Sequence, residues 1–499
     1  MGIVRPNYSV EGFSQFNWDR AKLIDVSDTV AFTVGRHRLK FGVEAVRITV
    51  RDFLEVKFGT YTFAPGPPQP GQNPIRYAQT FGAADIRYDQ TNLQVFAQDD
   101  FQISPRLSGN LGLRYEWQSD TDDLRRFAPR LGLAWDATGD GKTRVTVGAG
   151  VFYDAYYLKL TQQRLRRVPN GPQISYTIPF GAPGFPTFPN SLTVPPAGAD
   201  AGRLNLWIEP ASDLLNPYSS KFSLGFERAL GNRFAVSVEG LYSRTRREYR
   251  ANDMNHPTPF PRTAPGQVRS GAVADATRPL RTYDGVPVRV LTVLDNGGYS
   301  RYAALDVGIR RKYASGVRLE AHYVLSSSLT NVQFFSDFNS GVPNDWDDRD
   351  GAEEGPTDFH QKHRFVGSAS VDLPYGLRFA GIVTIASGLP VNPRTGVDNN
   401  GDTFVVDRPV GLGRNSFRGP KQASVDANLS REFRVRDRFR VEGRLEVFNV
   451  LNRNNFTNVN NIYGNGAQPL PTFLSPIAGI TNADPSRQIQ FLVRLLFGR

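Results

Sequence analysis

The sequence contains no cysteine and few histidines, and both shortages exclude kinds of chemistry. The absence of cysteine among 499 residues rules out disulfides, thiolate metal sites and cysteine nucleophiles. Only five histidines occur. Two of them, His360 and His363, form an HxxH pair, but this pair opens an expected strand, where odd spacing places the two rings on opposite faces. We therefore expect no enzyme activity, no catalytic residue, no resident metal and no cofactor.

The chain also lacks a long apolar run. No segment approaches the roughly 18 to 20 apolar residues that a membrane-spanning helix requires, so a helical membrane protein is excluded. The N-terminal residues, MGIVRPNYSVEGFSQFN, show no basic segment followed by an apolar one, and no signal peptide is expected. The formal net charge of +11 comes from basic residues spread along the chain among 48 acids. That distribution argues against nucleic acid as a partner.

What the chain does contain favours strands. Aromatic residues make up 12% of it, and 47 glycines and 35 prolines punctuate it throughout, as in proteins of many strands joined by turns. The C-terminal segment RQIQFLVRLLF (Arg487 to Phe497) alternates at period two. One face would carry Ile489, Phe491, Val493, Leu495 and Phe497. A strand with one apolar and one polar face, ending on an aromatic residue, is typical of the closing strand of an outer-membrane β-barrel.

The same alternation recurs along the chain. In Asn110 to Trp117 and in Arg438 to Val447, charged residues oppose apolar ones, and the charged face would line the barrel lumen with Arg114, Glu116, Arg440, Glu442, Arg444 and Glu446. An arginine turned to lipid at the bilayer midplane costs about 2 to 4 kcal/mol, so the strand register is strongly specified. Asp99 departs from the pattern because it falls on the lipid side, close to a predicted turn.

The connections between these strands are of two kinds. Short ones are predicted at Gly35 to Arg38, Ser104 to Leu107, Ala137 to Thr143, Leu230 to Arg233, Tyr313 to Gly316, Pro374 to Gly376 and Val435 to Asp437. Long ones are predicted near 52–86, 118–128, 158–218, 250–298, 332–362, 391–422 and 452–486. Short periplasmic turns and long extracellular loops characterise bacterial outer-membrane barrels. A soluble sandwich has no reason to sort its connections in this way, and no propeller-like repeat is present.

Seven hairpins and the final strand give fifteen strands, with a possible sixteenth near Phe53 to Phe63. Single-chain bacterial barrels have an even number of strands. The first predicted strand, Thr29 to Val34, runs inward to a short turn, so residues 1–28 are expected to be the remnant of an extracellular loop. Residues 29–499 would then be the C-terminal part of a larger transmembrane antiparallel β-barrel.

Several motifs resemble those of the TonB-dependent outer-membrane receptors, specifically their Oar-like branch. The similar segments are Phe127 to Asp154, Asn216 to Arg247, Ser387 to Pro390, Arg414 to Pro420 and Glu446 to Phe456. The resemblance extends from about His37 to the C-terminus. It implies a 22-stranded barrel in the outer membrane of Gram-negative bacteria, surrounded by lipid and filled by an N-terminal plug. It also implies a TonB-type energy transducer as partner of the intact protein, and recognition of the strand ending at Phe497 by the barrel-assembly machinery.

Two sets of loop residues are candidates for binding. Asp398, Asn400 and Asp402 offer alternate oxygen ligands that suit calcium, although the glycine and the terminal acid of a calcium loop are missing and turn formation explains them equally. In the loops 158–218 and 250–298, basic residues stand among aromatic ones, which suits an anionic or aromatic ligand as well as an ordinary solvated loop. The basic residues are Arg164, Arg166 and Arg167 in the first loop, and Arg246 and Arg247 beside the second.

The leading hypothesis is therefore the barrel of a TonB-dependent receptor, which in its intact form binds an extracellular ligand and takes it up with energy. By itself the fragment is expected to be incapable of transport. An outer-membrane adhesin or structural barrel without transport is the alternative. A secreted carbohydrate-active enzyme is a third possibility, but it would need paired acids in a cleft of a soluble core, which the lipid-like faces argue against.

Overall fold

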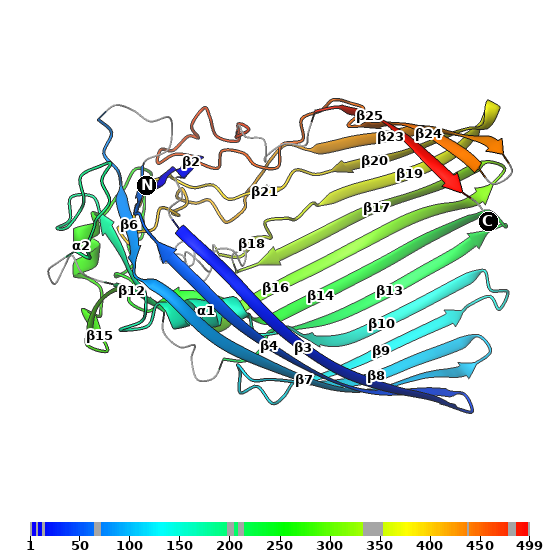
Figure 1. Ribbon diagram of the computed structural model, residues 1–499, viewed down its shortest axis with the longest axis horizontal. Coiled ribbons are helices and arrows are strands. Elements are labelled where there is room, and N and C mark those ends of the chain that lie inside the picture. Colours follow the sequence, from blue (N-terminus) through cyan, green and yellow to red (C-terminus); the bar gives the residue numbers. More distant parts are fainter. Residues whose placement is uncertain are drawn as a thin grey trace.

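Fifteen long strands form one antiparallel meander, in which each strand pairs with the next along the chain (Figure 1). The computed structural model describes residues 2–5, 8–11, 15–63, 71–196, 204–207, 214–332, 353–436, 439–477 and 486–497. The strands are β3 (Gln15–Val34), β4 (His37–Val56), β7 (Ala83–Ser104), β8 (Leu107–Gln118), β9 (Phe127–Asp136), β10 (Thr143–Tyr153), β13 (Tyr218–Leu230), β14 (Phe234–Asp253), β16 (Val286–Ala314), β17 (Val317–Thr330), β19 (His363–Leu373), β20 (Leu377–Ala386), β23 (Gln422–Arg436), β24 (Phe439–Phe448) and β25 (Gln488–Phe497). The predicted all-β fold is confirmed.

The two kinds of connection lie at opposite ends of the sheet. In Figure 1 the short turns gather at the right-hand end and the long connections at the left-hand end. All seven predicted turns join consecutive strands, the last between Arg436 and Phe439, whose two intervening residues lie outside the described part. Ser315 and Gly316 both have positive φ, 52° and 73°, which is the geometry that a tight two-residue hairpin turn requires. The sorting of connections that the sequence predicts is therefore confirmed.

The outer face of the sheet carries an apolar band. On β4 its outward residues from the turn upward are Leu39, Phe41, Val43 and Ala45. Phe41 and Val43 are 45% and 55% exposed, as lipid-facing side chains should be. The ten residues from His37 to Val46 rise about 25 Å along a tilted strand, which matches the height of an outer-membrane apolar band. Above the band the outward residues become Arg47, Thr49 and Arg51, so β4 continues beyond the membrane to Val56.

This extension changes two sequence-based expectations. The predicted loop over residues 1–28 is wrong for its described C-terminal half, because Gln15 to Asp28 belong to β3 and pair with β4 from Val56 to Val43. Charged residues interrupt the apolar alternation there and hide the strand in the sequence. The possible extra strand over Phe53 to Phe63 is divided, since its first residues complete β4 and Thr60–Thr62 form the short strand β5.

Asp99 and Asp28 face outward at or below the level of the apolar band. Asp99 lies near the turn end, and its carboxylate is 2.6 Å from His37 Nδ1. The acid that departs from the apolar pattern therefore has a hydrogen-bond partner beside it. Asp28 lies within the apolar band, level with Val43 and Val95 across the ladder. Its carboxylate accepts the backbone N–H of Thr29 at 2.9 Å. Among the described residues, β3 pairs with β4 as its only long-strand neighbour, so Asp28 stands at an edge of the sheet.

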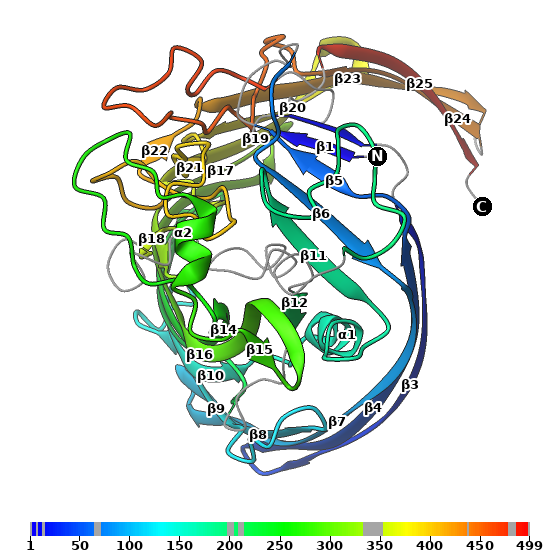
Figure 2. The ribbon, with the colours of Figure 1, turned by 90° about the vertical axis from the view of Figure 1, so that its left-hand side faces the viewer.

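The two edge strands run in the same direction. β3 and β25 both lead to the turn end, and no ladder joins them within the described ranges. Because the number of long strands is odd, these edges could meet only in parallel, whereas every neighbouring pair of long strands is antiparallel. Figure 2 shows the sheet as an arc around α1 (Leu158–Arg166), and Figure 1 shows α2 (Gly271–Ala276) at the far loop end of the molecule. Neither helix, nor any other in the described residues, is long and apolar enough to cross a membrane.

The long connections fold into a second layer at the loop end. β6 (Arg76–Phe81) pairs with β5 and with β11 (Ile174–Pro179), and β12 (Leu204–Trp207) joins β11 to the start of β16. Their buried side chains form one apolar core of Tyr61, Phe63, Tyr77, Tyr176, Ile178, Leu206, Val288 and Leu291. The sequence predicts only long connections here. It does not reveal the core, because the core is assembled from segments as distant as Tyr61 and Leu291.

The remaining short elements complete the loop end. They are β1 (Gly2–Arg5), β2 (Tyr8–Glu11), β15 (Thr282–Tyr283), β18 (Gly355–Pro356), β21 (Pro390–Val391) and β22 (Phe417–Arg418), while the 3-10 turn η3 (Pro374–Gly376) lies at the opposite end, between β19 and β20.

The lipid face can be tested at Val95, an outward residue in the middle of the band on β7. We expect Val95→Arg to lower the free energy of unfolding in lipid vesicles by about 2 to 4 kcal/mol, because it turns a charge to hydrocarbon. The matched control is Gln94→Arg, which places the same side chain on the other face between Glu44 and Glu116. Equal effects of the two substitutions in urea titrations would contradict the assigned orientation of the sheet.

Candidate ligand-binding interior and mouth

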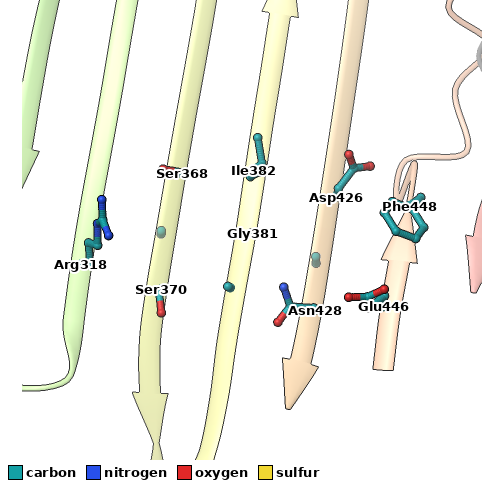
Figure 3. Close-up of a pocket in the computed structure, with 12 residues that line it drawn as sticks. Arg318, Ser368, Ser370, Gly381, Ile382, Asp426, Asn428, Glu446 and Phe448 are labelled. Carbon is teal, nitrogen blue, oxygen red and sulfur yellow. The ribbon is translucent and has the colours of Figure 1, made fainter. Parts of the chain in front are cut away.

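The inner face of the sheet is polar and holds a shallow groove of about 380 Å³ (Figure 3). Five neighbouring strands, β17, β19, β20, β23 and β24, contribute its walls. The labelled side chains in Figure 3 are Arg318, Ser368, Ser370, Ile382, Asp426, Asn428, Glu446 and Phe448, with Gly381 beside them. Charged, hydroxyl and amide groups therefore share one face with two apolar side chains, which suits contact with polar protein or ligand rather than with lipid.

The charges predicted to face the lumen lie on this inner face and neutralise one another. Arg444 donates to Glu442 at 2.8 Å and to Glu446 at 3.3 Å. Arg494 of the neighbouring strand lies 3.7 Å from Glu442. Arg440 donates to Glu432 at 2.9 Å. This part of the wall is a ladder of alternating charges that runs across β23, β24 and β25.

A second group of lumen charges lies on β8 and its neighbours. Arg114 is 3.9 Å from Glu116, and Arg126 donates to the other oxygen of Glu116 at 3.3 Å. Arg114 also lies over the Phe96 ring, 5.7 Å from its centroid. Both predicted residues thus have partners within the wall.

Helix α1 is fastened to the inner face near the loop end. At its start, the Tyr156 carbonyl accepts Gln90 Nε2 at 3.2 Å and Gln118 Nε2 at 3.3 Å, while the Tyr156 N–H donates to Gln118 Oε1 at 2.8 Å. At its end, Arg166 and Gln162 both donate to the buried carboxylate of Asp52 on β4. Asp52 is 1% exposed and Arg166 is 5% exposed. The ion pair is therefore shielded from water and joins the helix to the wall.

The five loop arginines do not act as one group. Arg164, Arg166 and Arg167 lie at the end of α1, where Arg166 is held by Asp52 and burial lowers the pKa of Arg167 to about 10. Arg246 pairs with Tyr218 across the ladder and points to the outer face, with its Nη1 3.3 Å from the Tyr218 hydroxyl. Arg247 lies over the Tyr218 ring and 3.8 Å from Asp123. Contact of these arginines with a ligand stays a prediction.

The loop with calcium-like spacing is closed by the protein itself. Asp398 accepts the backbone N–H groups of Gly401, Asp402 and Thr403 at 2.6, 3.1 and 2.9 Å. Arginines donate to three of its carbonyls: Arg269 to Asn400 at 2.6 Å, Arg278 to Asp402 at 2.7 Å, and Arg76 to Thr403. Burial raises the pKa of Asp398 to about 6 and that of Asp402 well above its usual range. In the described ranges, no group of three acids, histidines or cysteines is placed to hold a metal ion.

The two histidines of the HxxH pair have separate roles. His360 is buried, with Nε2 3.0 Å from the Ser326 carbonyl and Nδ1 2.9 Å from the Arg418 guanidinium. Burial lowers the pKa of His360, with Arg418 beside it. His363 Nδ1 lies 2.7 Å from the Tyr323 hydroxyl instead.

A second cavity, of about 370 Å³, opens at the loop end of the inner face. We call it the mouth pocket. Its walls come from the ends of β13, β14, β16 and β17 and from the segments that follow β10 and β18. Its lining side chains include the acids Asp154, Glu248 and Asp358, the base Arg414, and the aromatic residues Tyr157, Tyr249 and Phe359. No sequence motif marks these residues, because they are brought together from positions as distant as Asp154 and Arg414.

The architecture defines the class of protein: a transmembrane antiparallel β-sheet with short turns at one end, structured loops at the other and a polar interior. A family model described as "Outer membrane beta barrel domain" matches residues 5–123, 120–413 and 403–490. The chain belongs to this outer-membrane β-barrel family, and it resides in the outer membrane of Gram-negative type.

Particular relatives refine this assignment. The TonB-dependent transporter Oar of Myxococcus xanthus is 24% identical over 439 residues, which are 79% of this chain and 38% of that protein. The resemblance seen in the sequence motifs is thus confirmed as homology.

Solved structures support the fold. The outer membrane transporter YddB from Escherichia coli has a TM-score of 0.56 at 13% identity, over 96% of this chain and 54% of that one. A mutant of the ferric enterobactin receptor PfeA from Pseudomonas aeruginosa has a TM-score of 0.53 at 13% identity, with the same shares covered. The chain therefore spans about half of these receptors and a smaller share of Oar.

The latch between α1 and the wall is testable through Asp52. We expect Asp52→Asn to break the buried ion pair with Arg166, at a cost of up to about 3 to 5 kcal/mol because Asp19 remains as a weaker partner, and so to expose α1 to trypsin, which cleaves after arginine. The double variant Asp52→Leu/Arg166→Met removes both charges and should restore most of the protection. A control substitution, Arg51→Gln, changes an ion pair on the outer face and should leave cleavage unchanged. If Asp52→Asn is cleaved no faster than the parent, the latch does not hold the helix.

Proposed function

We propose that this chain forms most of the barrel wall and the extracellular mouth of a TonB-dependent receptor that binds a ligand outside the cell and moves it inward. The observation that carries the proposal is the structured loop end: an apolar core and a latched helix stand over a polar interior, which a purely structural barrel does not require. The homology with Oar supports the same function. The ligand-contacting groups would be the mouth pocket, the inner wall and, of the loop arginines, those that are neither buried like Arg166 nor turned to the outer face like Arg246.

The rest of the receptor would supply what this sheet lacks. Unpaired backbone groups in hydrocarbon cost several kcal/mol each, so further antiparallel strands must cover the free edges of β3 and β25. In the intact protein a plug would fill the polar interior and would link it to the energy transducer. The outward apolar residues of β25 would contact outer-membrane lipid, and its end at Phe497 would be the segment that the barrel-assembly machinery recognises.

The absence of cysteine from these 499 residues allows a direct test of energy coupling in cells that carry the complete gene, with any cysteine encoded elsewhere in it replaced by serine. Ser370→Cys places a thiol on the inner wall (Figure 3), and we expect its reaction with a membrane-impermeant maleimide to change in rate when the energy transducer is deleted. Tyr375→Cys is the matched control, because Tyr375 lies in the turn between β19 and β20 and is 83% exposed. Its labelling after permeabilisation should not depend on the transducer.

The same variants distinguish the alternative function. A structural barrel or adhesin without transport would label at Ser370→Cys at one rate with and without the transducer, and that result would contradict the proposal. Met254→Cys, at the loop end, should react in intact cells, which establishes the orientation of the sheet independently.

A further inference from the structure

The mouth pocket is acidic, which sets it apart from the arginine-rich loops around it. Three carboxylates, Asp154, Glu248 and Asp358, and one guanidinium, Arg414, line it, so three negative charges less one positive charge leave a net charge of −2. Arg414 lies 3.7 Å from Asp358 and is 3% exposed, and its charge also acts on Glu248. Asp358 also accepts Asn415 Nδ2 at 2.7 Å. One guanidinium therefore stands among three carboxylates, which leaves the pocket with an excess of negative charge.

Two of these acids, Asp154 and Glu248, accept hydrogen bonds but form no close ion pair within the described residues, although the Arg414 charge acts on Glu248 from a distance. Asp154 accepts the Tyr157 hydroxyl at 2.5 Å and the Ala155 N–H at 2.9 Å. Glu248 Oε1 accepts the Ser300 hydroxyl at 2.5 Å. Within the described residues, neither carboxylate forms an ion pair. Glu248 is partly withdrawn from water, whereas Asp154 is exposed to it. Carboxylates that form no ion pair within the protein are favourable partners for a cationic ligand.

A buried hydroxyl in the same pocket also lacks a partner. Tyr249 is 2% exposed, its ring packs edge-on against Tyr156 and Tyr157, and its hydroxyl has no hydrogen-bond partner. A buried polar group almost always has a hydrogen-bond partner, and burying one without a partner costs about 1 to 3 kcal/mol. A bound ligand that donates a hydrogen bond would remove this cost.

The wall opposite these groups is a row of hydroxyls. Ser219, Thr245, Ser300 and Thr330 lie directly opposite one another on four successive strands, and all line the pocket. Tyr157 and Phe359 add aromatic surface, and aromatic faces attract cations as well as apolar groups. The pocket thus combines hydroxyls, negative charge and aromatic rings, and Arg414 is the one cationic side chain among its lining residues.

We propose that the mouth pocket binds the cationic group of a small ligand, a guanidinium or primary ammonium, between Asp154 and Glu248, with Tyr249 as a further hydrogen-bond partner. This inference rests on the proposed function only in assuming that the pocket meets extracellular ligands. The volume of about 370 Å³ accommodates a group of amino-acid size rather than a whole large chelate. A basic side chain of a peptide or a free basic amino acid has the required chemistry.

The test uses the purified chain in detergent and four blocked amino-acid amides as probes in calorimetric titrations. N-acetylarginine amide and N-acetyllysine amide carry one positive charge, N-acetylcitrulline amide is the neutral counterpart of the first, and N-acetylglutamate amide carries a negative charge. We expect both cations to bind, at least tenfold more tightly than the neutral probe, and the anion not to bind. Tighter or equal binding of the neutral or anionic probe would overturn the inference, as would the failure of every probe to bind.

Substitutions locate the site. Glu248→Gln keeps the shape and the hydrogen bond from Ser300 and should weaken binding of the cations about tenfold or more without changing that of the neutral probe. Glu432→Gln, on the far part of the inner wall, should change neither. An unchanged affinity in Glu248→Gln would contradict the assignment, provided that heat-dependent gel mobility shows both variants to be folded. Because binding is measured without energy, its failure would leave the cysteine-labelling result, and hence the proposed function, unaffected.

Discussion

The constraint on which the whole structure depends is that each strand must satisfy two solvents at once. In lipid every backbone group needs a partner within the protein, so the only strand arrangement that crosses a membrane is a sheet in which each ladder is complete. The side chains then divide by parity, apolar outward and polar inward. On β7, Leu93 and Val95 face lipid, while Gln94 faces the interior between two glutamates. The uninterrupted pairing from β3 to β25 and the short turns both follow from this requirement.

The interior poses the opposite problem, because charges there must be matched or hydrated. The wall solves it with ladders such as Glu442, Arg444 and Glu446, and the loop end solves it with the buried pair of Asp52 and Arg166. The loop with Asp398 is clamped by arginines that reach its carbonyls. The mouth pocket is different: within the described part of the chain, Asp154 and Glu248 form no close ion pair, and the Tyr249 hydroxyl has no hydrogen-bond partner. Carboxylates that are not paired within the protein are what would allow the mouth pocket to bind a cation.

Local periodicity predicts those parts of the fold that depend on near neighbours. The strands and turns are confirmed because alternation and turn residues such as Ser315 and Gly316 act within a few positions. The extension of β3 before Thr29 is missed, because Asp28 interrupts the apolar face within the band and most of the remaining extension lies above the membrane, where the outward face no longer needs to be apolar. The loop core around Tyr61 and Leu291 and the mouth pocket are also missed, because they join segments that no periodicity connects. Of the predicted site residues, the lumen charges form ion pairs along the wall, and Arg166 and Arg246 have partners that the sequence does not indicate; their contact with a ligand stays a prediction.

The most direct measurement of the central claim is the accessibility of consecutive residues on one strand to reagents from each solvent. Single cysteines at Leu93 through Gln98 of β7, each carrying a nitroxide in lipid vesicles, report collisions with oxygen from the bilayer and with a water-soluble nickel complex. The account predicts that positions 93, 95 and 97 respond mainly to oxygen and that positions 94, 96 and 98 respond mainly to nickel. A uniform response to nickel at all six positions would contradict a sheet that separates lipid from a polar interior.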